Sequence, residues 1–139
     1  MEIWQLTPWD EVDVTLRLLM AAAAGGLIGF ERERAEKPAG FRTHLLVCIG
    51  ATLLTVSSMY GFSGFADPSR VAAGVAVGVG FLGAGTIIRH EAGVIGLTTA
   101  ASIWVVAAIG LAFGTGLYLP GALVTLVTLV ALRFPGQRG

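Results

Sequence analysis

Charged residues are scarce in this sequence. Lysine, arginine, aspartate and glutamate together make up 13% of its 139 residues, whereas an average soluble domain carries about 25%. The positive and negative charges also cancel, and a net charge of zero gives no indication of a nucleic-acid partner. These two deficits exclude an ordinary soluble domain and a basic nucleic-acid-binding domain.

Cysteine and catalytic motifs are also lacking. Cys48 is the single cysteine, which excludes an intramolecular disulfide and a zinc site built on cysteine pairs. The sequence contains no HExxH, GxSxG or P-loop motif. We therefore expect a protein that is not an enzyme and has no resident cofactor. Mg²⁺ stays open as a ligand, although the sequence shows no set of free carboxylates that would form a dedicated cage for it.

Long apolar runs are what the sequence has in abundance, since 55% of its residues are hydrophobic. Five segments of about 17–19 residues are long enough to approach the span of a ~30 Å hydrocarbon core as helices. They cover residues 14–30, 44–62, 71–88, 97–113 and 117–133. We predict an all-α integral membrane bundle of about five short transmembrane helices. It forms a single domain over residues 1–139, with no soluble C-terminal domain.

Basic residues between these segments predict the orientation of the chain in the membrane. Most of them fall on one side, at Arg32, Arg34, Lys37, Arg42, Arg89, Arg133 and Arg138. The opposite side has only Arg70 in its loops and follows an acidic N-terminal segment. Because basic loops stay in the cytoplasm, the N-terminus is predicted outside and the C-terminus inside. Arg17, just within the first segment, is expected to turn outward and pair with Asp13.

Glycines recur at helical spacing within the apolar segments. Gly25 and Gly29 form one pair and Gly74 and Gly78 another, and two more, Gly83 and Gly85, lie near the end of the third segment. Glycine at a spacing of four lets helix backbones approach closely in lipid. Three interpretations stay open: tight packing within one bundle, a homo-oligomer interface for which a dimer is the simplest expectation, and a helix that lines a permeation path.

Polar residues gather at the predicted cytoplasmic ends of the segments. Glu31 follows the first segment directly, and Arg42 and His44 open the second. Because one short loop separates them, we expect these groups to approach each other. The full candidate cluster is Glu31, Arg32, Arg42, Thr43, His44, Arg89, Thr98 and Thr99. It is either a site for a ligand or partner, or a set of anchors at the membrane interface.

A second candidate pair lies on the predicted outer side, before the third segment. In the stretch Asp67-Pro68-Ser69-Arg70, an aspartate followed by proline is typical of a helix start, with Asp67 as the N-cap. Arg70 is a basic residue on the side that usually avoids them. We expect it to pair with Asp67 or with an acidic residue of the N-terminal segment.

Five blocks of the sequence resemble the MgtC/SapB family of bacterial membrane proteins. They are residues 28–32 (IGFER), 39–44 (AGFRTH), 67–70 (DPSR), 80–85 (GFLGAG) and 96–104 (GLTTAASIW). The resemblance covers about residues 14–118. It implies a five-helix, multi-pass protein of the bacterial cytoplasmic membrane, linked to growth at low magnesium. Larger members carry a cytoplasmic C-terminal domain, whereas this chain resembles their N-terminal transmembrane domain only.

Two functions follow from the residues and the resemblance together. The family is labelled as magnesium transporters, yet some members resemble regulators, including regulators of the ATP synthase. We expect a membrane regulator that binds a ligand or another membrane protein. The alternative is an oligomeric cation transporter or channel for Mg²⁺. Against transport, segments two to five hold no charged residue near their centres, where transport sites usually show one.

Overall fold

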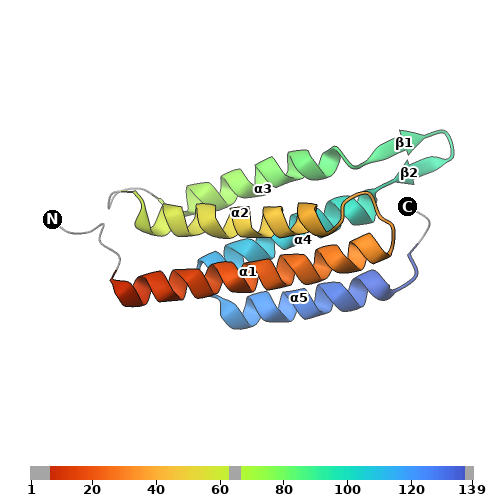
Figure 1. Ribbon diagram of the computed structural model, residues 1–139. Coiled ribbons are helices and arrows are strands. Elements are labelled where there is room, and N and C mark those ends of the chain that lie inside the picture. The colour runs from red at the N-terminus through yellow and green to blue at the C-terminus, as the bar shows by residue number, and fades with distance from the viewer. Residues whose placement is uncertain (1–6, 63–66, 137–139) are drawn as a thin grey trace.

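A computed structural model describes residues 7–62 and 67–136 of the chain (Figure 1). Its elements are α1 (Pro8–Arg34), α2 (Phe41–Tyr60), α3 (Ser69–Ala84), β1 (Ile88–His90), β2 (Gly93–Ile95), α4 (Leu97–Gly114) and α5 (Tyr118–Arg133). The predicted helical class and the five helices are confirmed. Among the residues that predicted the orientation, Arg138 lies outside the described part of the chain.

The five helices lie alongside one another in an elongated bundle, and the hairpin β1–β2 projects from one end of it (Figure 1). The central helix is α4, because it packs against each of the other four. Its side chains Val106, Ile109 and Phe113 are buried together with Ile28 of α1 and Cys48 of α2. The helices α3 and α5 each contact α4 and one other helix, so they lie at the periphery.

The length and surface of the helices fit a lipid environment. Three of them, α1, α2 and α4, are long and apolar enough to cross a membrane. The other two have 16 residues each, which gives about 24 Å at 1.5 Å per residue. Large apolar side chains are widely exposed, and Val77, Phe81 and Leu119 reach 76%, 81% and 80% exposure. A soluble protein rarely exposes so much apolar surface, whereas lipid tails accommodate it.

The first helix begins earlier than the predicted residue 14. The hydroxyl of Thr7 accepts a hydrogen bond from the backbone N–H of Asp10 at 3.3 Å. The backbone N–H of Thr7 donates in return to the Asp10 carboxylate at 2.9 Å. These reciprocal bonds form a capping box, and Pro8 fits the first helical position. Hydropathy alone misses such a start because the capped first turn is polar.

The third helix ends earlier than predicted. It stops at Ala84, and Ile88 instead pairs with Ile95 in the antiparallel hairpin. Thr86 accounts for the end of the helix, because its N–H and its hydroxyl both donate to the carbonyl of Gly83, at 2.9 and 2.7 Å. This tight turn replaces the helical bonding pattern and sends the chain out into the hairpin before α4 begins.

Gly96 connects the hairpin to α4 at a position that a larger residue does not fit. Its φ is +90°, and a Cβ added there would lie 2.0 Å from the carbonyl oxygen of Thr86. We expect Gly96→Ala to lower the free energy of unfolding by about 1–2 kcal/mol, through backbone strain and this clash. Hydrogen exchange at the hairpin amides should become faster.

The matched control for this prediction is Gly93→Ala. Gly93 also has a positive φ, +133°, but a Cβ there would meet nothing within 4 Å. It therefore reports backbone strain without the clash, and we expect a smaller loss. Equal losses in the two variants would contradict the close approach of Gly96 to Thr86.

One pair of predicted packing glycines does bring two helices together. A Cβ at Gly25 would lie 2.7 Å from the Cβ of Cys48, and a Cβ at Gly29 would lie 2.7 Å from the Cα of Phe41. Both neighbours belong to α2. Any side chain at these positions would push α1 away from α2, so close packing within the bundle accounts for this pair.

The other pair faces open space. A Cβ at Gly74 or Gly78 would meet nothing within 4 Å. Together with Gly50 they line an apolar groove of about 520 Å³ between α2 and α3. Gly83 is intermediate, because an added Cβ would lie 3.3 Å from a carbonyl oxygen of α4. A Cβ at Gly85 would lie 3.3 Å from a carbonyl oxygen of α3, the helix that ends just before it. An oligomer interface and a permeation path therefore stay open for the Gly74–Gly78 face.

Candidate functional site

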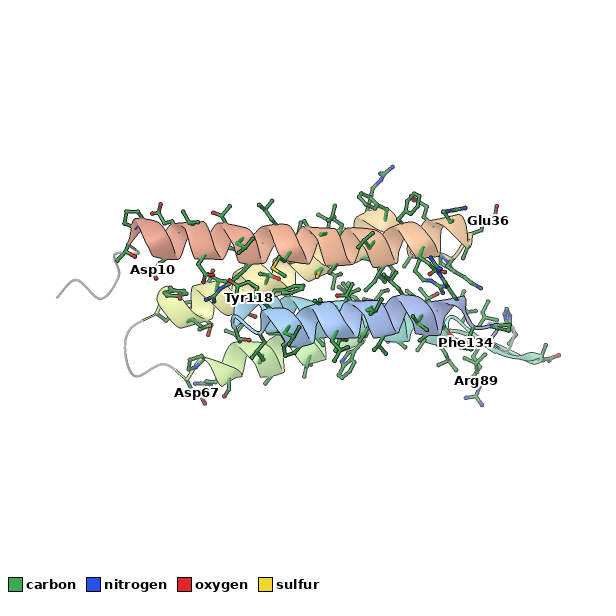
Figure 2. The ribbon with its side chains drawn as sticks, turned by 90° about the horizontal axis from the view of Figure 1, so that it is seen from below. Asp10, Glu36, Asp67, Arg89, Tyr118 and Phe134 are labelled. Carbon is green, nitrogen blue, oxygen red and sulfur yellow. The ribbon has the colours of Figure 1, made fainter. Side chains whose placement is uncertain are left out.

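Most of the predicted cluster lies at one end of the bundle, which we call the basic end. It comprises the last turns of α1 and α5, the first turns of α2 and α4, and the hairpin (Figure 1). In Figure 2, Glu36 and Phe134 mark this end, whereas Asp10, Asp67 and Tyr118 lie toward the other. Segments distant in the sequence thus meet here, and their side chains build the candidate site.

A partly buried ion pair lies at the end of α1. The Nε of Arg32 donates to Oε2 of Glu31 at 2.7 Å, and its Nη2 donates to Oε1 at 3.2 Å. The same Nη2 also donates to the carbonyl oxygen of Leu132 at 3.3 Å, which connects α1 to α5. Arg32 is only 3% exposed. A buried guanidinium held by two partners is fixed in position, unlike an anchor that reaches out to water.

A second buried contact joins α2 to α4 through His44. Its Nδ1 lies 2.9 Å from the carbonyl oxygen of Gly40, and its Nε2 lies 2.9 Å from the hydroxyl of Ser102. That hydroxyl is in turn 2.7 Å from the carbonyl oxygen of Thr99. Ser102 was not among the predicted site residues, although it belongs to the same sequence block as Thr98 and Thr99.

The geometry around His44 determines where its protons lie. A carbonyl oxygen only accepts, so Nδ1 must carry a hydrogen to bond Gly40. In the neutral ring Nε2 then accepts from the Ser102 hydroxyl. In the protonated ring Nε2 donates, and the hydroxyl of Ser102 is released to donate to Thr99. The two protonation states of the ring therefore require two different orientations of one buried hydroxyl.

The remaining four members of the predicted cluster are exposed. They are Arg42, Thr43, Arg89 and Thr98. Within the described residues, neither the Arg42 nor the Arg89 side chain makes a hydrogen bond or ion pair, and Arg89 points away from the bundle in Figure 2. The structure thus divides the predicted cluster into two buried contacts and four exposed residues, and the function of these residues stays a prediction.

A polar pocket opens between α1, α4 and α5 at this end, and we call it the basic pocket. Its volume is about 730 Å³, within the range of small-molecule sites. Glu31, Arg32 and Thr98 of the predicted cluster line it, together with Lys37 and Arg133. The sequence had marked Lys37 and Arg133 only as orientation signals. These two residues line the same pocket because the loop between α1 and α2 lies close to the end of α5.

The described residues do not group into a metal site. No set of three or more histidine, cysteine, aspartate or glutamate side chains lies close enough together among residues 7–62 and 67–136. At the basic pocket the single carboxylate, Glu31, is already bound by Arg32. A hard divalent cation needs several free oxygen ligands, so this pocket is not suited to hold one.

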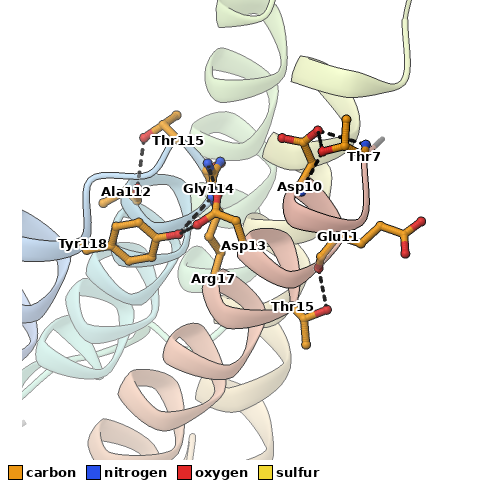
Figure 3. Close-up of polar contacts among 10 residues, drawn as sticks. All are labelled: Thr7, Asp10, Glu11, Asp13, Thr15, Arg17, Ala112, Gly114, Thr115 and Tyr118. Atoms are coloured by element: carbon orange, nitrogen blue, oxygen red, sulfur yellow. Dashed lines mark hydrogen bonds and ion pairs between the residues drawn. The ribbon is translucent and has the colours of Figure 1, made fainter. Parts of the chain in front are cut away.

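The opposite end contains a buried arginine, Arg17. Its predicted pairing with Asp13 is confirmed, at 2.5 Å from Nη2 to Oδ2, whereas its burial, at 8% exposure, was not predicted. Its Nη1 donates to the carbonyl oxygen of Gly114 at 2.8 Å, and its Nε lies 3.3 Å from the hydroxyl of Tyr118 (Figure 3). Tyr118 donates to Asp13. The network ties α1 to the turn between α4 and α5.

On the predicted outer side, Asp67 bonds to a different residue from the one expected. The carboxylate of Asp67 accepts from the N–H of Ser69 at 2.9 Å and from its hydroxyl at 2.7 Å. These bonds, and a weaker attraction from Arg70, lower the pKa of Asp67 below its usual value. The N-cap itself is Pro68. Asp67 therefore stabilises the start of α3 from one residue further away, and its carboxylate bonds to Ser69 and not to the Arg70 side chain.

The sequence of this chain is similar to those of several known proteins. The model of the MgtC family matches residues 18–137. YhiD of Escherichia coli (strain K12), whose name gives it a provisional role as a magnesium transporter, is 47% identical over 125 residues, covering 85% of this chain and 58% of YhiD. No solved structure gives a significant match.

Two further relatives extend the comparison. MgtC of Brucella abortus (strain 2308) is 47% identical over 126 residues, covering 90% of this chain and 52% of that protein. SrpB of Synechococcus elongatus is 41% identical over 145 residues, covering 95% of this chain and 80% of SrpB. The chain spans little more than half the length of YhiD and of the Brucella protein.

Proposed function

The chain belongs to the MgtC family, and we propose that it acts as a non-enzymatic regulator in the bacterial cytoplasmic membrane. It is a multi-pass protein with its basic end in the cytoplasm, where the positive charges favour that orientation. This end binds a small ligand or another membrane protein. The name of YhiD supports a role of this kind in magnesium homeostasis.

The distribution of charge along the bundle carries this proposal. In the described residues, the charged side chains and histidines lie near the helix ends or in the connecting segments, except Arg17, which lies further inside α1 but reaches the end of α4. The groove between α2 and α3 is lined by apolar side chains and glycine, whereas the basic pocket opens at one end. An ion that crosses a membrane usually needs an ionisable or carbonyl-lined site midway. Charged groups near the ends suit binding better than passage.

A second function is favoured by a different observation. The open Gly74–Gly78 face and its groove leave room for a second copy, and two copies together could enclose a path that one chain does not. This supports the alternative of an oligomeric cation transporter, with backbone carbonyls in place of side chains as ligands. A homodimer would be its smallest form.

Two measurements separate the functions. Mg²⁺ flux into proteoliposomes that hold the purified protein would establish transport, and flux would contradict the regulator. Crosslinking in native membranes would identify a partner protein. If the crosslinks contain only copies of this chain and the proteoliposomes show no flux, the protein-binding form of the proposal fails and only a small ligand remains.

Arg42→Ala is expected to abolish function without unfolding the protein. Arg42 is exposed and makes no ion pair within the described residues, so its charge is available to a ligand or partner. Function is measured as the ability of the protein to restore growth at low Mg²⁺ in a bacterial strain that lacks its own copy, and we expect the variant not to restore it. Stability should change by less than about 0.5 kcal/mol, as for an exposed substitution.

The control is Arg70→Ala, which removes an exposed arginine from the opposite end of the bundle. We expect this variant to support growth as the wild type does. A well-expressed Arg42→Ala variant with full activity would contradict the functional role of Arg42.

A further inference from the structure

We propose that the basic pocket binds a phosphate-bearing anion, either free in the cytoplasm or as the headgroup of an anionic lipid. The inference deepens the proposed function by naming the chemical class of the ligand, and it rests on that function for its biological meaning. It depends on the charge, the burial and the arrangement of the residues that line the pocket.

Three cationic side chains from three separate segments line this pocket. Arg32 comes from α1, Lys37 from the loop after α1, and Arg133 from the last turn of α5. The single acidic lining residue is Glu31, whose two oxygens accept from Arg32 at 2.7 and 3.2 Å. The lining therefore carries an excess of positive charge, and its one carboxylate is already occupied.

This charge selects an anion over a cation. A divalent cation would meet a lining with more positive than negative charges and no free carboxylate to replace its water ligands. A phosphate group has several oxygens that accept hydrogen bonds from arginine and lysine together. The hydroxyl of Thr98, from α4, lines the same pocket and supplies a neutral donor. The volume of about 730 Å³ leaves room for a group larger than phosphate itself.

The burial of Arg32 distinguishes this site from ordinary membrane anchoring. Basic residues that anchor a helix extend their charged groups to water. Arg34 fits that description, since it is exposed and its guanidinium lies 5.8 Å from the ring centre of Phe30. Arg32 is instead 3% exposed and held by Glu31 and by the carbonyl of Leu132. A positive charge fixed in advance loses little freedom when an anion binds.

The test measures binding of two probes to the full chain in nanodiscs of phosphatidylcholine. Inorganic pyrophosphate is titrated by calorimetry, and phosphatidic acid retained by the protein is measured by native mass spectrometry. Binding of pyrophosphate identifies a soluble ligand, whereas retention of phosphatidic acid over phosphatidylcholine, with no pyrophosphate binding, identifies a lipid headgroup. Either outcome supports the proposal if it depends on the pocket.

Dependence on the pocket is measured with a matched pair of variants. Arg133→Gln removes an exposed pocket cation and is expected to weaken binding of the effective probe at least about tenfold. Arg34→Gln removes the same charge from the same end of the bundle, but Arg34 does not line the pocket. It should change binding less than about twofold, through weak long-range attraction alone.

Two results would overturn the inference. The first is that neither probe binds. The second is an equal loss in both variants, which would mean diffuse attraction to a basic surface instead of a site. The proposed function is tested separately by growth at low Mg²⁺ and by crosslinking. A chain that rescues growth and captures a partner without binding either probe would disprove this ligand and leave the regulator in place.

Discussion

Gly110→Ala is expected to lower the free energy of unfolding by about 3 kcal/mol, because the α2–α4 contact has no room for a methyl group. A Cβ at Gly110 would lie 2.4 Å from the carbonyl oxygen of Cys48 and 2.9 Å from the Cβ of Ala51. The backbone of α2 would have to move away from α4. The hydroxyl of Thr52, 2.9 Å from the Gly110 carbonyl, would then be separated from that partner. Unfolding by SDS in mixed micelles measures the loss.

The matched control is Gly74→Ala, in another helix of the same bundle. A Cβ there would meet nothing within 4 Å. The change should be a gain in stability of at most about 1 kcal/mol, since only the helix propensity differs and alanine favours the helix over glycine. If the two variants lost similar stability, the α2–α4 contact would be looser than the structure describes. A large loss from Gly74→Ala in lipid, absent in dilute detergent, would instead point to an oligomer interface at the groove.

Arg32→Met is expected to lower the free energy of unfolding by about 2 kcal/mol. The substitution removes the charge that faces Glu31 and the donor to Leu132, while it keeps most of the apolar stem. Breaking one side of a fully buried ion pair costs about 3–5 kcal/mol. We expect less here, because the Glu31 side chain is 19% exposed and water screens part of the loss.

A double variant isolates the ion pair. In Arg32→Met with Glu31→Gln, no uncompensated carboxylate is left, so we expect at least half of the lost stability to return. The same SDS titration measures the single variants and the double variant. If the two single losses simply add, then Arg32 stabilises the end of α1 through its packing and its bond to Leu132, and the ion pair itself contributes little.

The helices could be predicted because their signal is local. A run of apolar residues long enough to cross a membrane has to form a helix there, whatever it packs against. Hydropathy therefore located all five. It misplaced the start of α1, where the polar capping box of Thr7 and Asp10 continues the helix outward. Hydropathy also extended α3 past Ala84, because a strand residue such as Ile88 is as apolar as the residues of a helix end.

The candidate site could be predicted only in part. The sequence indicated that polar residues gather at one end, since that follows from loop positions and basic charge. It could not indicate which of them are buried. Arg32 and Arg34 lie two residues apart, yet one is enclosed and the other is exposed. The difference depends on where α5 ends, 100 residues away at the carbonyl of Leu132.

Buried polar contacts between distant segments gave no signal of their own. Ser102 faces His44, and Tyr118 faces Asp13, across separations of 58 and 105 residues. The position of Arg17 depends in the same way on the turn after α4, whose Gly114 carbonyl accepts from it. Each of these partners is an ordinary residue in its local sequence. Its role follows from which helix faces touch.

The membrane bundle of five helices, the location of most charges near the helix ends and the family resemblance in five ordered blocks all follow from the order of residues along the chain. Those features depend on hydropathy and charge along the chain, which neighbours in space do not alter. The packing of the helices is needed to see which glycines form close contacts, which arginines are buried, and that one pocket is lined by Arg32, Lys37 and Arg133. These depend on distances between segments, and such distances exist only once the helices have packed.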